Sequence, residues 1–256
     1  MKLNPAIVFL GIALLCTGRL SGEDKSAVLS RTDIEQIVRE YILQHPEVLM
    51  ESVRAYQERE RIAAQQRSRE AVLAKRSELF KESASPVAGK ADASVAIVQF
   101  FDYNCGYCRR VWPILAKLIE ERQNVQVIFK ELPILGPESH MAARGALAAH
   151  KQGAYVQFHR ALMDLKSPTT AATIEETGRK LGLDVARLKA DMDSAEVQAI
   201  LTQNQRLASA IGVQSTPSFV IGNELVSGAM DLPGFEALIT KAVEEKAAAG
   251  TAPANP

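Results

Sequence analysis

The stretch VQFFDYNCGYCRRVWPIL, from Val98 to Leu115, decides the fold. It begins with a short apolar run, typical of a buried strand, and ends with a basic and then apolar run, typical of a helix. The pair Cys105-Gly-Tyr-Cys108 lies where the predicted helix begins. Free backbone N–H groups and the helix dipole favour an anion at such a position. The first sulfur is therefore expected to be stabilised as a thiolate.

Four kinds of site can contain a Cys-X-X-Cys pair. Zinc needs about four ligands, and here two would have to come from the scattered histidines His45, His140, His150 and His159. Haem attachment requires histidine after the second cysteine, where this chain has Arg109. A structural disulfide across so short a loop stabilises a fold only slightly. We therefore favour a redox pair, and we expect no metal and no other cofactor.

The redox interpretation assigns a separate task to each cysteine. Thiols in such motifs have pKa values of about 3.5 to 7.5, against about 8.5 for free cysteine. Cys105 is predicted to attack disulfides, and Cys108, one turn later, to resolve the mixed disulfide. Gly106 and Tyr107 between them are predicted to tune the thiolate. The two arginines that follow add positive potential or form a solvated helix face.

The flanking sequence predicts a βαβ unit. Residues 95–101 and 125–132 are short apolar runs typical of strands, and the helix that carries the cysteines lies between them. Their arrangement predicts an α/β domain.

The rest of the domain is predicted to be largely helical. Helical patterns dominate an insertion at about residues 137–211, a hairpin is predicted about Gly222-Asn223, and Asp231 is predicted to cap a last helix. The catalytic domain is expected to span residues 94–246. Residues 247–256 are predicted to form a flexible tail.

Residues 1–22 are typical of a secretory signal peptide. Lys2 precedes a ten-residue apolar core, and cleavage after Gly18 or Gly22 fits the small residues there. The core is shorter than the about 20 residues of a membrane-spanning helix, which disfavours an uncleaved anchor. Export to the periplasm is therefore predicted.

The leader also contains the third cysteine, Cys16. It stands where a lipoprotein cysteine could lie, but the leucines before it are bulkier than lipobox residues, so a lipid anchor is the less favoured alternative. Removal of the leader leaves two cysteines in a compartment where disulfides persist.

Residues 23–82 are predicted to form a helical oligomerisation segment. A helix over residues 46–80 would extend about 50 Å, whereas a domain of the remaining size has a radius of gyration near 15 Å. We expect the apolar stripe of residues 30–82 to pair with other copies, giving a homo-oligomer, a dimer or a trimer. The alternatives are a segment that folds back and a partly disordered stalk. Residues 83–93 have the composition of a linker.

The overall charge is balanced. The chain has 256 residues, 30 of them basic and 30 acidic, with a net charge of zero. This balance offers no basic field for nucleic acid, so none is expected as a partner.

Three segments together resemble a known family: FFDYNCGYCRRVWPIL, ELPILGPESHMAARGALAA and STPSFVIGN. They resemble the DsbA-like thiol:disulfide oxidoreductases of the thioredoxin superfamily, in the ScsC-type subgroup with an N-terminal helical oligomerisation segment. The resemblance covers nearly the whole chain. It implies a thioredoxin fold with a helical insertion, preceded by a helical segment. It also implies that Thr216-Pro217 is the cis-proline loop beside the cysteines, where an incoming peptide would pair; the alternative for Pro217 is the start of an edge strand.

One position departs from the family pattern. Many relatives carry a buried glutamate six residues before the first cysteine, and this chain has Gln99. Lys130 and Glu131 are expected either to supply a substitute charge or to form a surface pair. Asp102 is interpreted as a turn residue rather than an acid in a proton relay. Packing or rim positions are expected for three aromatic side chains: Tyr103, Tyr107 and Trp112.

The likeness to DsbC isomerases, in Gly-Tyr and in Thr216, favours a disulfide isomerase, an oxidase or both. The substrates would be cysteine-containing exported proteins, and a membrane redox partner is expected. Two alternatives remain: a dedicated reductant, for example in cytochrome maturation, and a non-enzymatic envelope or surface protein that is indifferent to Cys105→Ala.

Overall fold

The computed structural model describes residues 29–166 and 169–251, and the chain divides into two compact units between Tyr56 and Gln57. The predicted signal peptide, Cys16 and the last residues of the predicted tail lie outside the described residues. Within the described part, no helix combines the length and apolar character needed to cross a bilayer.

The first unit consists of α1 (Arg31–Gln44) and the beginning of α2 (Pro46–Ala74). Ser30 caps α1 in a capping box with Asp33, in which the Asp33 N–H donates to Ser30 Oγ at 3.2 Å. No residue of α1 is buried. Large apolar side chains remain about half exposed along both helices: Ile34, Ile37, Val38, Tyr41, Val48, Leu49, Met50, Val53 and Tyr56.

The end of the predicted oligomerisation segment belongs to the second unit. The predicted helix over residues 46–80 is interrupted at Lys75, and α3 spans Arg76–Phe80. Val72 and Leu79 are wholly buried in a cluster with Val98 and other residues of one sheet face. Their burial makes this part of the segment a structural component of the second unit.

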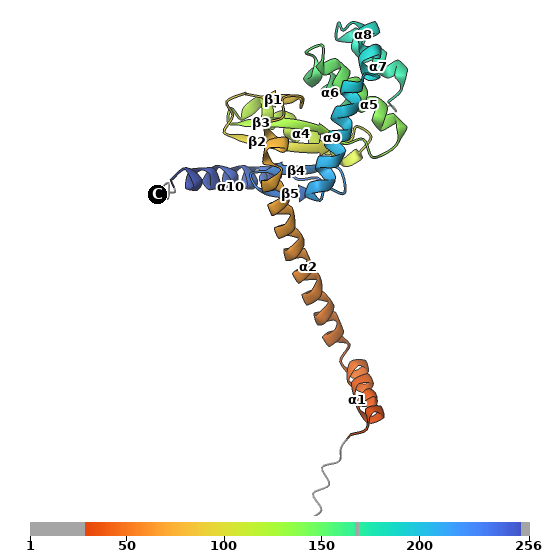
Figure 1. Ribbon diagram of the computed structural model, residues 1–256, viewed down its shortest axis with the longest axis vertical. Helices are drawn as coiled ribbons and strands as arrows, with labels where there is room; N and C mark the ends of the chain where they lie inside the picture. Colours follow the sequence, from red (N-terminus) through yellow and green to blue (C-terminus); the bar gives the residue numbers. More distant parts are fainter. Residues whose placement is uncertain (1–28, 167–168, 252–256) are drawn as a thin grey trace, which may run out of the picture. The chain divides into compact units, whose positions relative to one another are not determined.

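The second unit is built on a mixed five-stranded sheet in the order β1-β3-β2-β4-β5 (Figure 1). The strands are β1 (Val87–Gly89), β2 (Val95–Phe101), β3 (Val125–Glu131), β4 (Ser218–Ile221) and β5 (Glu224–Ser227). Only β2 and β3 pair in parallel among these strands, and the other pairs are antiparallel. The predicted βαβ unit and the two-residue hairpin turn are confirmed.

Strand β1 lies inside the stretch predicted as a linker, residues 83–93. It pairs with β3, with Val87 opposite Ile128. Gly89 ends it with φ of +102°, and an added Cβ would lie 2.7 Å from Val125 O. A backbone this close to its neighbour needs glycine, and the part of the chain expected to be a linker thus extends the sheet.

Helices cover both faces of the sheet. On one face, α4 (Gly106–Glu121) and α10 (Leu232–Thr251) pack on alternate residues of the strands, such as Ile97 and Phe101. On the other face, α3 and α9 (Ala195–Ile211) pack on Val98 and its neighbours. The alternation of side chains along β2 therefore separates a face with the cysteine helix from a face without it.

The predicted insertion is helical, with α5 (Pro137–His150), α6 (Tyr155–Met163), α7 (Ala171–Lys180) and α8 (Val185–Met192) followed by α9. Figure 1 shows α5 to α8 gathered at one end of the sheet. Together with the sheet, this insertion confirms the expected fold class.

The predicted tail begins as helix, because α10 continues to Thr251. Residues 247–249 are alanines, which have the highest helix propensity. The first five residues of the predicted tail are therefore helical.

Candidate active site

The two cysteines lie at the start of α4, as the sequence predicts. Cys105 is the N-cap residue and Cys108 lies in the first turn. Cys105 is 7% exposed and Cys108 is 0% exposed. Both are free thiols. Cys105 is therefore the sulfur that an incoming disulfide can reach.

The surroundings of Cys105 favour its thiolate. The pKa of Cys105 is lowered to about 5, chiefly because the Cys108 thiol donates a hydrogen bond to it. Hydrogen bonds from the Thr216 side chain and from the backbone N–H groups of Cys108 and Tyr107 act in the same direction, while burial opposes them. Cys105 is thus ionised at neutral pH.

Cys108 has the opposite character. Its pKa is raised far above the ordinary value, first because its proton is shared with Cys105 and second because burial disfavours the charged sulfur. The helix therefore presents one reactive thiolate and one protected thiol, the asymmetry that stepwise disulfide exchange requires.

The Thr216-Pro217 loop lies against the first cysteine. The peptide bond between the two residues is cis. Thr216 O lies 3.2 Å from Cys105 Sγ and accepts a hydrogen bond from it in the thiol form. Pro217 is buried and β4 begins at the next residue. The loop and the cysteine helix, 111 residues apart in the sequence, thus form one site.

The residues between the cysteines face outward. A Cβ added at Gly106 would have no neighbour within 4 Å, and Tyr107 is 58% exposed. The Arg110 guanidinium lies 5.0 Å from the Tyr107 ring centre. Arg109 instead turns inward, where its Nε donates to Tyr103 O at 2.7 Å. Tyr107 and Arg110 therefore occupy the rim of the site.

Asp102 organises the loops around the cysteines. Its carboxylate accepts hydrogen bonds from the N–H groups of Asn104, Ile134 and Leu135, and from Ser139 Oγ, at 2.7 to 3.0 Å. These contacts agree with its interpretation as a turn residue.

Gln99 is wholly buried on the sheet face that carries α4, the same face as Ile97 and Phe101. Neither polar atom of its side chain has a hydrogen-bond partner among the described residues. A neutral amide thus stands where the family pattern has an acid.

Lys130 and Glu131 lie on opposite faces of the sheet, since they are adjacent on β3. Lys130 is wholly buried, donates to Glu78 O at 3.0 Å and pairs with Glu82. Burial lowers its pKa. The surface-pair interpretation was wrong because both residues are buried, and Lys130 cannot supply a charge near the cysteines because it faces away from α4.

Glu131 instead meets residues for which the sequence indicated no role in the site. Tyr103 and Tyr155 hydroxyls donate to its Oε1, and His159 Nδ1 lies 3.0 Å from the Tyr103 hydroxyl. Tyr155 and His159 are four residues apart on α6, a spacing that places both on one helix face. That spacing was the only available signal, and it does not reveal the meeting with Glu131. Across the described ranges, no cluster of three or more metal-ligating side chains occurs.

Comparison with known proteins agrees with this geometry. The family described as the DSBA-like thioredoxin domain matches residues 96–240. The chain belongs to this family. Residues 31–63 match the Copper resistance protein ScsC N-terminal domain.

Two solved structures resemble the chain closely. A thioredoxin-like oxidoreductase from Silicibacter pomeroyi is 38% identical, with a TM-score of 0.64, and covers 66% of this chain and 98% of its own. The catalytic domain of Proteus mirabilis ScsC is 31% identical, with a TM-score of 0.63, and covers 69% and 98%.

Curated relatives differ in length. The Probable disulfide bond formation protein D of Bacillus anthracis is 28% identical over 67% of this chain and 82% of its own. The Na(+)/H(+) antiporter NhaA 3 of Salinispora tropica is 25% identical over 61% of this chain, but the chain spans only about a quarter (24%) of that relative's length.

Proposed function

We propose that this protein is an exported thiol–disulfide oxidoreductase that rearranges or introduces disulfides in exported proteins. The observation that carries the proposal is the asymmetric cysteine pair: a thiolate-stabilised Cys105 beside a buried, protonated Cys108, with Thr216 O at 3.2 Å. Relatives named as disulfide bond formation proteins and as thioredoxin-like oxidoreductases support it.

In the first step, the Cys105 thiolate attacks one sulfur of a substrate disulfide. The substrate S–S bond breaks, a mixed disulfide forms, and the other substrate sulfur leaves as a thiolate. That thiolate can attack a second disulfide of the same substrate and free another substrate thiolate. This thiolate then attacks the mixed disulfide, which forms a new substrate disulfide and releases Cys105 as a thiolate. No net electron transfer occurs in this isomerisation.

In the second route, Cys108 attacks the Cys105 sulfur of the mixed disulfide. Cys108 loses its proton, the Cys105–Cys108 disulfide forms, and the substrate leaves reduced. The reverse sequence transfers the disulfide to a substrate dithiol and is oxidation. While Cys105 is a thiolate, its negative charge keeps the buried Cys108 protonated. Formation of the mixed disulfide removes that charge, so Cys108 attacks only after a substrate has reacted with Cys105.

The N-terminal unit favours the isomerase. Its apolar side chains, among them Ile37 and Tyr41, are about half exposed and follow one face of α1. A second or third copy would cover this face and bring several cysteine pairs into one assembly. Such an assembly suits a substrate that must be held while its disulfides are exchanged.

The test is reactivation of scrambled ribonuclease, with sedimentation of the same samples. Wild type should reactivate the substrate, and Cys105→Ala should not while it remains oligomeric. Ile37→Glu should sediment as a monomer with much weaker isomerase activity. Gln36→Glu, the same charge change on the preceding residue of α1, is the matched control and should behave as wild type. Reactivation by Cys105→Ala would contradict the proposed chemistry, and monomeric wild-type protein would contradict the proposed assembly.

A further inference from the structure

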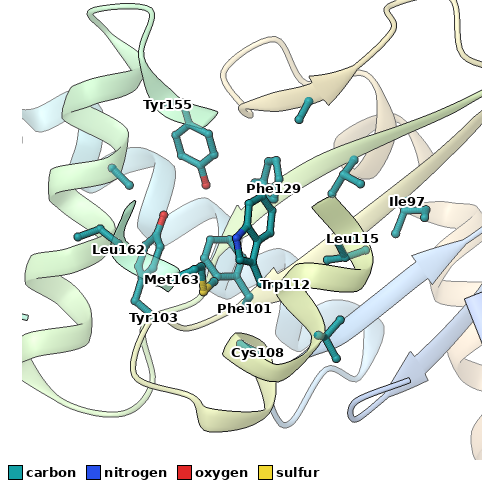
Figure 2. Close-up of a cluster of buried hydrophobic side chains, with 14 of the residues drawn as sticks. Ile97, Phe101, Tyr103, Cys108, Trp112, Leu115, Phe129, Tyr155, Leu162 and Met163 are labelled. Atoms are coloured by element: carbon teal, nitrogen blue, oxygen red, sulfur yellow. The ribbon is translucent and has the colours of Figure 1, made fainter. Parts of the chain in front are cut away.

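Four buried polar side chains near the cysteines do not react in the disulfide exchange proposed above. Tyr103 precedes the cysteine pair, Glu131 ends β3, and Tyr155 and His159 lie on α6. Each is at most 3% exposed. They will be called the Glu131 cluster. Figure 2 shows the hydroxyl groups of Tyr103 and Tyr155 turned toward each other.

Glu131 Oε1 is the centre of the cluster. It accepts hydrogen bonds from Tyr155 at 2.7 Å and from Tyr103 at 3.1 Å. Oε2 has no hydrogen-bond partner among the described residues. An ionised carboxylate so placed is costly, whereas a carboxylic acid is tolerated. Burial raises the pKa of Glu131 well above its usual range, and the negative charge of Asp102 adds to the effect.

His159 is neutral for the same reason. Its ring is wholly buried among aromatic side chains, 4.6 Å from the rings of Trp112 and Phe129, and burial lowers its pKa to about 3. The cluster thus contains an acid and a base without any net charge. A carboxylate here would add negative charge to the core that also encloses the thiolate, which would raise the pKa of Cys105.

Tyr103 connects the cluster to the reactive sulfur. Its hydroxyl is held by Glu131, and its backbone oxygen accepts from Arg109 Nε at 2.7 Å. The preceding residue, Asp102, accepts the Cys105 N–H at 3.1 Å through its backbone oxygen. Hydrogen bonds to buried groups therefore fix the turn from Tyr103 to Cys105. This turn places the Cys105 sulfur at the N-terminus of α4.

We propose that Glu131 is a positioning residue for Cys105, which anchors the Tyr103 hydroxyl and thereby fixes the turn that holds the Cys105 sulfur at the start of α4. The inference rests on the proposed function only in treating Cys105 as the attacking thiolate.

The two tyrosines provide a matched pair of variants, because both donate to the same oxygen but only Tyr103 belongs to the turn. The background is Cys16→Ser, which leaves Cys105 and the buried Cys108. The measurement is the rate of Cys105 alkylation by iodoacetamide as a function of pH. Tyr103→Phe should raise the fitted Cys105 pKa by about half a unit, roughly a threefold change in the ionisation constant. Tyr155→Phe should leave the Cys105 pKa unchanged, although it should destabilise the protein about as much as Tyr103→Phe does.

Glu131→Gln and Glu131→Leu test the acid itself. Glutamine keeps a neutral side chain that can accept from Tyr103, so it should retain the Cys105 pKa, whereas leucine should raise it as Tyr103→Phe does. Equal shifts in both tyrosine variants, or no shift in Tyr103→Phe and Glu131→Leu, would overturn the proposal. If Tyr103→Phe does not fold, the comparison of Glu131→Gln with Glu131→Leu decides alone. Iodoacetamide requires no protein substrate, so failure of the ribonuclease assay would leave this test unaffected.

Discussion

The two units of the chain differ in what covers their apolar side chains. In the second unit, Leu79 and its neighbours are buried against the sheet, whereas in the first unit Ile37 and Leu49 are 53% and 48% exposed. Burial of apolar surface is the main source of folding free energy. The second unit therefore has a core of its own, and the first unit is expected to acquire its core from other copies.

The largest effect should come from the cysteine pair, which tests whether catalysis resides in the second unit. Cys105→Ala should abolish disulfide exchange, because Cys108 is buried and protonated. Cys108→Ala should instead accumulate mixed disulfides through Cys105, detectable as covalent adducts on non-reducing gels. Adducts formed by Cys105→Ala through Cys108 would contradict the assignment.

The second prediction compares removal of a buried leucine from the second unit with removal of an exposed leucine from the first. Leu79→Ala should destabilise the second unit by about 2 to 5 kcal/mol, as for other leucines removed from a core. Leu49→Ala should change that unit's stability by less than about 0.5 kcal/mol, because it lies outside that core. Trp112 is the only tryptophan of the chain and lies in the second unit, so its fluorescence during urea unfolding reports that unit. Equal losses of stability in the two variants would show that Leu79 and Leu49 do not differ in their contribution to the core of the second unit.

A smaller effect concerns pH. The Cys105 pKa is about 5 in the folded protein, below the ordinary cysteine value of about 8.5, so the unfolded chain binds more protons between these values and stability rises with pH. The contribution is complete above about pH 9 and is lost as pH falls through about 5. The free energy of unfolding of reduced wild type, minus that of Cys105→Ala, should therefore increase across this window. A flat difference would rule out a stabilised thiolate.

The smallest effect should come from the sheet face without the cysteines. Lys130 pairs with Glu82 there, so Lys130→Met combined with Glu82→Leu should leave the Cys105 pKa unchanged. Such replacements of a buried ion pair are often neutral or stabilising. A change in thiol reactivity would mean that charge on this face reaches the redox site.

The local parts of the fold could be predicted from the sequence. Residues 95–101 are a continuous apolar run, and the observed β2 has those bounds, because a strand buried on both faces needs no alternation. The end of this strand also predicted that a helix starts near Cys105. Strand β1 could not be predicted, since its three residues lie among Ser, Pro and Gly and its pairing with β3 is a long-range contact.

The site was predictable where one segment contains it. Cys105 and Cys108 share a turn, whereas Glu131 reaches Tyr155, and Tyr103 reaches His159, only because the helical insertion packs against the end of β3. Adjacent residues on a strand face opposite sides, so Lys130 and Glu131 could not act as a pair. The resemblance identified Thr216-Pro217, a loop that the periodicity of the sequence alone does not connect with the cysteines.

The most direct test of the account is the redox potential of the Cys105–Cys108 pair, measured by equilibration in graded glutathione buffers with thiol alkylation. A thiolate stabilised in the reduced form makes the disulfide oxidising, so the account predicts a midpoint of about −120 to −200 mV, within the range of oxidases and isomerases. A midpoint below about −250 mV would place the pair with thioredoxin-like reductants and contradict the proposed direction of exchange.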